Sequence, residues 1–147
     1  MHNTYSMNIQ RVAGAAHILH DGKVLLAKRA KDDFLGGHWE LVGGSLEWGE
    51  FPTDGLLREV KEESGLDVEI IHPYYVHHYF HEKEGVQIVE IAYLCRVAGD
   101  PSVVLSEEHE AYQWVTEDEL LHVMPVSDKM RKVIEEGFRF WGELQRK

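Results

Sequence analysis

The feature that most constrains the fold of this chain is a segment with helix signals at both ends. Pro52 suits the first turn of a helix, and Gly65 suits the position just after one, so we predict a helix over residues 52–64. Its apolar face, which would pack on the rest of the protein, carries Leu56, Leu57 and Val60. β-rich segments precede and follow this helix, so the chain should combine a sheet with helices.

Runs of alternating and β-branched residues predict the strands. We expect them over residues 11–20, 23–29, 39–42, 67–81, 86–98 and 111–116. Asp21-Gly22 is a tight hairpin signal, and polar residues 82–85 should form a second turn. A loop is expected over 30–37, with further helices over 117–122 and 127–145. We find no repeat or linker, and expect an α/β fold in one domain, residues 1–147, with a mixed sheet sandwiched between helices (α/β/α).

Three carboxylates lie together on the helix over 52–64. Glu59, Glu62 and Glu63 are spaced at i, i+3 and i+4 and therefore share one face. Such a cluster repels itself unless a cation joins it, and hard oxygen ligands suit Mg²⁺ or Mn²⁺. A solvated acidic face balanced by Arg58 and Lys61 is the alternative.

Composition narrows the classes of partner. The formal net charge of −11 argues against binding a nucleic-acid backbone, but not against a small phosphorylated substrate bridged by a divalent metal. No apolar run approaches the ~20 residues of a membrane span, and residues 1–10 lack the apolar core of a signal peptide. The single cysteine, Cys95, excludes an internal disulfide and lies in an apolar run, where it should be buried. We therefore expect a cytoplasmic protein without a membrane partner.

The residues around the helix also resemble a known motif. Gly44, Glu50 and the run Arg58-Glu59-Val60-x-Glu62-Glu63-x-Gly65-Leu66 match the fixed positions of the Nudix box, here residues 44–66. Arg29, Trp39-Glu40 and Gln113-Trp114-Val115 extend the resemblance to MutT-like members of that family. Val42 departs from the usual proline, and Gly55 departs from the usual alanine. The resemblance implies a Nudix fold over most of the chain.

The resemblance also implies roles for the box residues. Glu59, Glu62 and Glu63 would bind Mg²⁺, for which Mn²⁺ could substitute, with the carbonyl of Gly43 as a further ligand. Glu62 and Glu63 are in addition catalytic candidates. Structural roles are implied for Gly44, Gly65 and an ion pair between Glu50 and Arg58.

Other implied roles lie outside the box. Arg29, as a phosphate clamp, and Glu40 would bind substrate. A further carboxylate would come from Glu107, Glu108 or Glu110, of which we favour Glu110 as a catalytic residue. Ser127 or Asp128 would read the base, although both are also ordinary helix N-cap residues.

The implied activity is metal-dependent hydrolysis of a nucleoside diphosphate linked to another group, foremost a nucleoside triphosphate. Nucleotide sugars, ADP-ribose and dinucleoside polyphosphates are alternative substrates, and a non-catalytic nucleotide sensor or an isopentenyl diphosphate isomerase is an alternative function. His77 and His81 alternate onto one strand face, where zinc or a polar cleft, with His78 nearby, would explain them. A homodimer is one assembly that the sequence leaves open.

Overall fold

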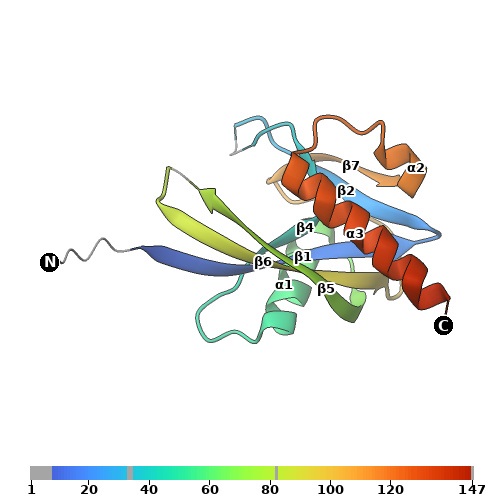
Figure 1. The fold of residues 1–147 in the computed structure, drawn as a ribbon, viewed down its shortest axis with the longest axis horizontal. Helices are drawn as coiled ribbons and strands as arrows, with labels where there is room; N and C mark the ends of the chain where they lie inside the picture. Colours follow the sequence, from blue (N-terminus) through green and yellow to red (C-terminus); the bar gives the residue numbers. More distant parts are fainter. Residues whose placement is uncertain (1–7, 33–34, 82, 147) are drawn as a thin grey trace, which may run out of the picture.

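The computed structural model describes residues 8–32, 35–81 and 83–146. Asp33, in the expected loop, and Glu82, in the expected second turn, lie outside them. The strands are β1 (Ile9–His20), β2 (Lys23–Arg29), β3 (Trp39–Glu40), β4 (Val42–Ser45), β5 (Val68–His81), β6 (Val86–Val97) and β7 (His109–Val115). The helices are α1 (Pro52–Ser64), α2 (Glu117–Leu120) and α3 (Asp128–Gln145) (Figure 1).

The strands form one mixed sheet. Its main path runs β3-β2-β1-β6-β5, with β4 on β1 and β7 on β2. β1 and β6 are parallel, and the other pairs are antiparallel. β1 pairs with β4 over Ala13 to Ala16 and with β2 only at Leu19 and His20. Because β1 changes its partner from β4 to β2 along its length, Gly43 and Gly44 of β4 lie against the middle of β1.

A helix covers each face of the sheet, because alternate residues of the central strands point to opposite sides. Ala15 and Leu19 belong to the core that α3 completes with Val133, Ile134 and Phe138. Ile18 and Tyr93 belong to the second core, which α1 completes with Leu56 and Val60. In Figure 1, α3 crosses in front of the sheet and the fainter α1 lies behind it. The expected α/β/α sandwich is confirmed.

Several expectations hold and others are corrected. The helix over 52–64 has the predicted bounds, and Asp21 and Gly22 form the hairpin turn with φ of 51° and 75°. The strand expected over 39–42 is instead two strands, and β4 continues through the glycine pair because Gly43 and Gly44 pair with β1. β7 begins at His109, two residues before the predicted start.

The predicted core is correct in most places. Cys95 is buried, as expected, but Leu57 is 40% exposed and does not join Leu56 and Val60 in the core. Helical geometry explains this correction, since Leu56 and Val60 lie one turn apart and Leu57 is rotated away from both. None of the described helices has the length and apolar character needed to cross a membrane.

Candidate active site

The end signals of α1 set the positions of its carboxylates. Pro52 stands in the first turn, and Gly65 ends the helix with φ of 74°. Glu63 is 7% exposed, and the side chain of Glu59 is 16% exposed. The side chain of Glu62 is 58% exposed. The three glutamates share a face by spacing, but only two of them are turned into the protein.

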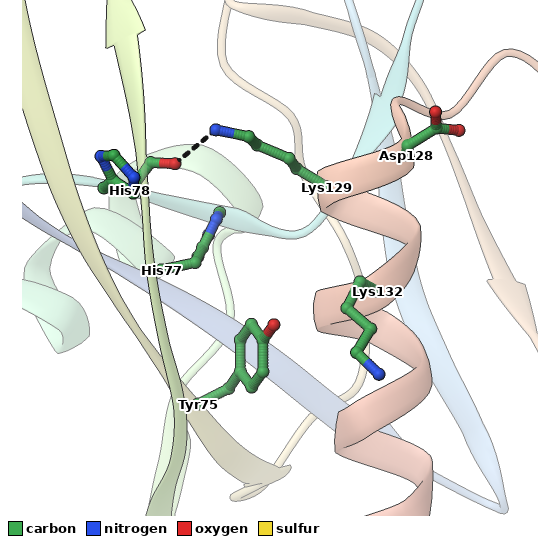
Figure 2. A pocket seen from close by; sticks show the side chains of 6 residues that line it. All are labelled: Tyr75, His77, His78, Asp128, Lys129 and Lys132. Carbon is green, nitrogen blue, oxygen red and sulfur yellow. Dashed lines mark hydrogen bonds between the residues drawn. The ribbon is translucent and has the colours of Figure 1, made fainter.

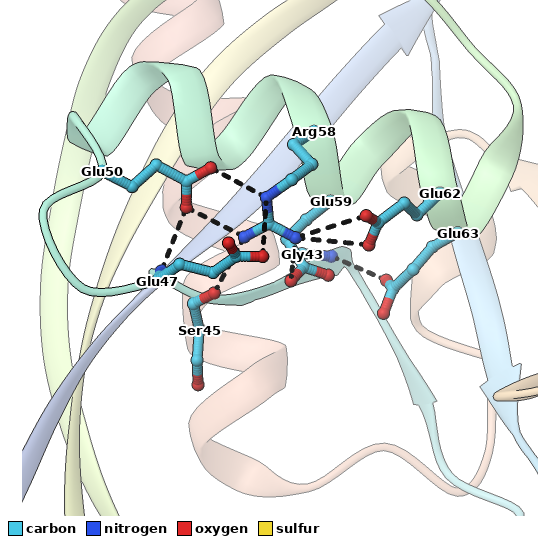
Figure 3. A network of polar contacts seen from close by, with 8 residues as sticks. All are labelled: Gly43, Ser45, Glu47, Glu50, Arg58, Glu59, Glu62 and Glu63. Carbon is cyan, nitrogen blue, oxygen red and sulfur yellow. Dashed lines mark hydrogen bonds and ion pairs between the residues drawn. The ribbon is translucent and has the colours of Figure 1, made fainter.

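Arg58 ties the loop before the helix to the helix (Figure 3). Its Nε and Nη2 donate to the two oxygens of Glu50 at 2.8 and 2.9 Å, and Nη2 also donates to the carbonyl of Ser45 at 3.3 Å. The bond from Arg58, then the backbone N–H of Glu47, lower the pKa of the Glu50 carboxyl to about 2. The ion pair that the resemblance implies is therefore present in a two-pronged form.

The same guanidinium reaches the acidic face. Arg58 Nη1 lies 3.0 Å from Glu59 Oε1 and 3.3 Å from Glu62 Oε2. Figure 3 shows both carboxylates turned toward Arg58, while Glu63 points to β4. Burial raises the pKa of the Glu59 carboxyl, and Arg58 opposes that rise. Arg58 thus compensates part of the negative charge of this face.

Two glycines let the helix and its loop approach closely. A Cβ on Gly44 would lie 2.5 Å from the carboxyl carbon of Glu59. A Cβ on Gly55 would collide with Leu46 and come within 2.8 Å of Glu50 Oε1. From the sequence, Gly55 shows only its unfavourable helix propensity. The structure adds the reason for it, because the loop packs against this turn of the helix.

Glu63 is the most buried carboxylate of the cluster. Its Oε1 accepts the backbone N–H of Gly43 at 3.0 Å. Burial raises the pKa of Glu63, and a hydrogen bond shared with Glu108 raises it further. Since the N–H and C=O of one strand residue point to the same side, the carbonyl of Gly43 faces α1 as well.

The three candidates for the additional carboxylate have different surroundings. Glu108 raises the pKa of Glu63, and its charge also raises the pKa of Glu59. Glu110, the favoured candidate, instead has its Oε1 3.6 Å from Lys28 Nζ. Glu107, Glu108 and Glu110 are all exposed, so exposure does not distinguish them. Because Glu108 lies just before β7, the alternation of side chains along a strand does not predict which way its side chain points.

The donor set fits a divalent cation. Hard oxygen donors come from Glu59, Glu63, Glu108 and the Gly43 carbonyl. Burial and neighbouring carboxylates raise the pKa of Glu59 and of Glu63, and a bound cation would remove that repulsion. As the side chains are placed, no three His, Cys, Asp or Glu side chains of the described residues could together hold a metal ion. Glu59 and Glu62 contact Arg58 instead, so both would have to change partner.

A second polar cluster joins three strands beside this one. Arg29 Nη1 donates to Glu40 Oε2 at 2.9 Å, and His109 Nε2 lies 2.9 Å from the same oxygen. Burial, then the charges of Glu90 and Glu40, raise the pKa of the Tyr79 hydroxyl, whereas Arg29 lowers it. Glu40 also contributes to the raised pKa of Glu63.

Arg29 and Glu40, which the sequence predicted to bind substrate, are therefore brought together near the acidic cluster. His109 had no signal in the sequence that distinguished it from the other histidines.

A hollow of about 360 Å³ lies between β5 and α3 (Figure 2). Its lining residues are Tyr75, His77, His78, Asp128, Lys129 and Lys132. Tyr75 and His77 point from β5 toward α3, and Lys129 Nζ donates to the carbonyl of His78 at 2.7 Å. Aromatic and cationic groups thus line one open space.

The structure shows the surroundings of the predicted base-reading residues and of the histidines on β5. Ser127 caps α3, because its hydroxyl accepts the N–H of Met130 at 3.1 Å, whereas Asp128 lines the hollow. His77 lies 2.8 Å from Glu90, and His78 bonds Gln87 at 2.9 Å. The rings of His77 and His78 therefore both contact side chains of β6, and zinc binding by the histidines stays a prediction.

Comparison with known proteins identifies the family. The model of the NUDIX domain matches residues 10–137, and this chain belongs to the Nudix family. A MutT-like protein of Streptomyces ambofaciens is 37% identical over 83% of this chain and 69% of that protein. The CTP pyrophosphohydrolase of Escherichia coli strain K12 is 33% identical over 73% of this chain and 76% of that enzyme.

A solved structure and a longer relative complete the comparison. The crystal structure of a MutT Nudix hydrolase from Burkholderia pseudomallei has a TM-score of 0.75 and 33% identity, covering 86% of this chain and 97% of that one. An octanoyltransferase of Myxococcus xanthus is 35% identical over 71% of this chain, but the chain spans only 29% of that protein. Family and relatives make the chain a Nudix hydrolase, an enzyme of the class that cleaves phosphoric anhydride bonds.

Proposed function

We propose that this Nudix hydrolase is a Mg²⁺-dependent pyrophosphohydrolase that converts a nucleoside triphosphate to its monophosphate and pyrophosphate, with Mn²⁺ as a substitute metal. The observation that carries the proposal is the buried Glu63, whose Oε1 accepts the N–H of Gly43 and whose pKa is raised by burial and by Glu108. The similarity to a CTP pyrophosphohydrolase supports the substrate class.

Five groups would hold the metal. They are the carboxylates of Glu59, Glu62, Glu63 and Glu108 and the carbonyl of Gly43. Bound Mg²⁺ neutralises the charge of a diphosphate and lowers the pKa of a coordinated water. Arg58 keeps the helix and the glycine loop together through Glu50, so the groups on α1 and Gly43 stay in place relative to one another, whereas Glu108 comes from the segment before β7.

Side chains of the protein would supply proton transfer, phosphate binding and nucleoside binding. Glu63 would also be the general base that takes the proton of the attacking water, and the bond from the Gly43 N–H to its Oε1 orients the carboxylate. Arg29, held by Glu40, binds phosphate oxygens with its planar fork. The hollow at Tyr75 and His77 receives the nucleoside, where the tyrosine ring can stack on a base.

The test is a panel of purine and pyrimidine nucleoside triphosphates, nucleotide sugars, ADP-ribose and dinucleoside polyphosphates, each with Mg²⁺. We expect the fastest turnover, with release of pyrophosphate, on a triphosphate, and we expect excess chelator to abolish it. Turnover that persists in chelator removes the metal from the mechanism. If another group of substrates is turned over faster, that group is the substrate class instead of the triphosphates. Nucleotide binding without hydrolysis favours a nucleotide sensor.

A variant tests the base. Glu63→Gln should lower kcat by about 10²–10⁴-fold, the usual loss on removal of a general base. Glu135→Gln, on the exposed side of α3, is the matched control and should leave kcat unchanged. A Glu63→Gln variant within threefold of the wild type would make Glu63 dispensable.

A further inference from the structure

The cluster of Arg29, Glu40 and His109 joins three adjacent strands through one oxygen. Arg29 on β2 and His109 on β7 are direct register partners, and Glu40 comes from β3 on the other edge of β2. Both Arg29 Nη1 and His109 Nε2 lie 2.9 Å from Glu40 Oε2. Because that carboxylate oxygen accepts from arginine, the imidazole must be the donor and carries its proton on Nε2.

Burial increases from one end of this cluster to the other. The side chain of His109 is 1% exposed, that of Glu40 is 19% and that of Arg29 is 25%. Nδ1 of His109 has no hydrogen-bond partner among the described residues. The bond to Glu40 is therefore the polar contact that fixes the ring, and the chain of contacts leads outward from His109 to the guanidinium.

We propose that His109 is a positioning residue that acts on the substrate through Glu40 and Arg29. The inference rests on the proposed function, in which Arg29 binds phosphate. A carboxylate held by Arg29 alone could rotate about its side-chain bonds and carry the guanidinium with it. The second bond, from His109, holds Glu40 in place and so keeps Arg29 directed at the phosphate.

A double-mutant cycle tests this chain of action. Arg29→Met and His109→Leu should each lower kcat/KM for the preferred triphosphate by about 10- to 100-fold, as expected when a hydrogen bond to a charged group is lost. The loss should lie mainly in KM, because Arg29 holds the substrate before the reaction as well as during it. The double variant should be no worse than Arg29→Met, because His109 would have nothing left to position.

Two further variants separate positioning from a general loss of structure. His109→Gln keeps an N–H donor for Glu40 and should restore most of the activity that His109→Leu loses. His17→Leu removes another buried histidine, one without a hydrogen-bond partner among the described residues, and should leave kcat/KM within about twofold. The melting temperature of every variant shows that each is folded at the assay temperature.

The outcomes separate this inference from the proposed function. Losses that multiply in the double variant, no rescue by His109→Gln, or a His109→Leu variant as active as the wild type would each overturn the role of His109 and leave the proposed function standing. The cycle is repeated with the affinity for an α,β-imido nucleoside triphosphate, measured by calorimetry. A wild type that binds this analogue but hydrolyses nothing overturns the proposed activity alone, and the affinities then decide the role of His109. A wild type that does neither overturns both.

Discussion

His17 should make this protein lose stability in mild acid. It lies on β1 with no exposed surface, and neither ring nitrogen has a hydrogen-bond partner in the part of the chain that the structure describes. Its ring packs edge-on against Phe138, with centroids 4.8 Å apart, and against Tyr74 at 5.9 Å. α3 approaches it closely, since a Cβ on Gly137 would lie 2.6 Å from His17 Cε1. Burial lowers the pKa of His17 from 6.5 to about 3.

The sign and size of the effect follow from that shift. Above pH 6.5 the imidazole is neutral in both states and costs no proton on folding. As the pH falls from 6.5 toward 3, the unfolded chain binds a proton that the folded chain does not, so the free energy of unfolding decreases. Between about pH 7.5 and about pH 5, one such group lowers it by about 2 kcal/mol.

The assay is urea unfolding of the wild type and of His17→Leu at both pH values. The other titrating groups affect both proteins alike, so the difference between their free energies of unfolding isolates His17. We expect this difference to move by about 2 kcal/mol in favour of the variant at the lower pH. A difference that stays the same within about 0.5 kcal/mol would refute the reasoning, because His17 would then titrate equally in both states.

Three further predictions concern residues whose roles the structure has revised. Ser127→Ala should lower the free energy of unfolding by about 1 kcal/mol without changing the ratio of kcat/KM between purine and pyrimidine substrates; a changed ratio would give Ser127 a part in reading the base. Gly55→Ala should destabilise the protein by about 1–3 kcal/mol in urea unfolding, because overpacking against Leu46 outweighs the gain in helix propensity; a more stable variant would contradict the close approach. Glu108→Gln should lower kcat at least about tenfold, whereas Glu110→Gln should stay near the wild type; the reverse order in steady-state assays would restore Glu110.

The helix that carries the site was predictable because its signals are local. Pro52 and Gly65 act through their own backbone preferences, and the periodicity between them requires no knowledge of the rest of the chain. Glu50 and Arg58 were likewise identified together by the spacing of the motif, and their ion pair is present. Sequence reasoning therefore gave the helix bounds and the box side chains.

The remaining errors concern residues whose roles depend on distant partners. Gly43 and Gly44 read as the end of a strand, yet pairing with β1 makes them part of one. Glu108 and Glu110 carry the same side chain two residues apart, and only their tertiary surroundings separate them, because Glu108 acts on Glu63 whereas Glu110 on β7 contacts Lys28. His109 gains its neighbour Arg29 through a strand register that includes an irregularity at Lys28/Arg29. Long-range register of this kind is set by tertiary pairing, which one sequence does not display.

The burial of Glu63 beside Glu108 sets stability against the proposed activity. Because the pKa of Glu63 is raised in the folded state, the unfolded chain releases its proton more easily, and above the ordinary pKa of a glutamate the folded state becomes less favoured as the pH rises. Glu63→Gln would remove that penalty and, on the proposed mechanism, the turnover with it. A search for more stable versions of this chain would therefore favour the loss of a side chain on which the proposed mechanism depends, and such a search must be coupled to an activity screen.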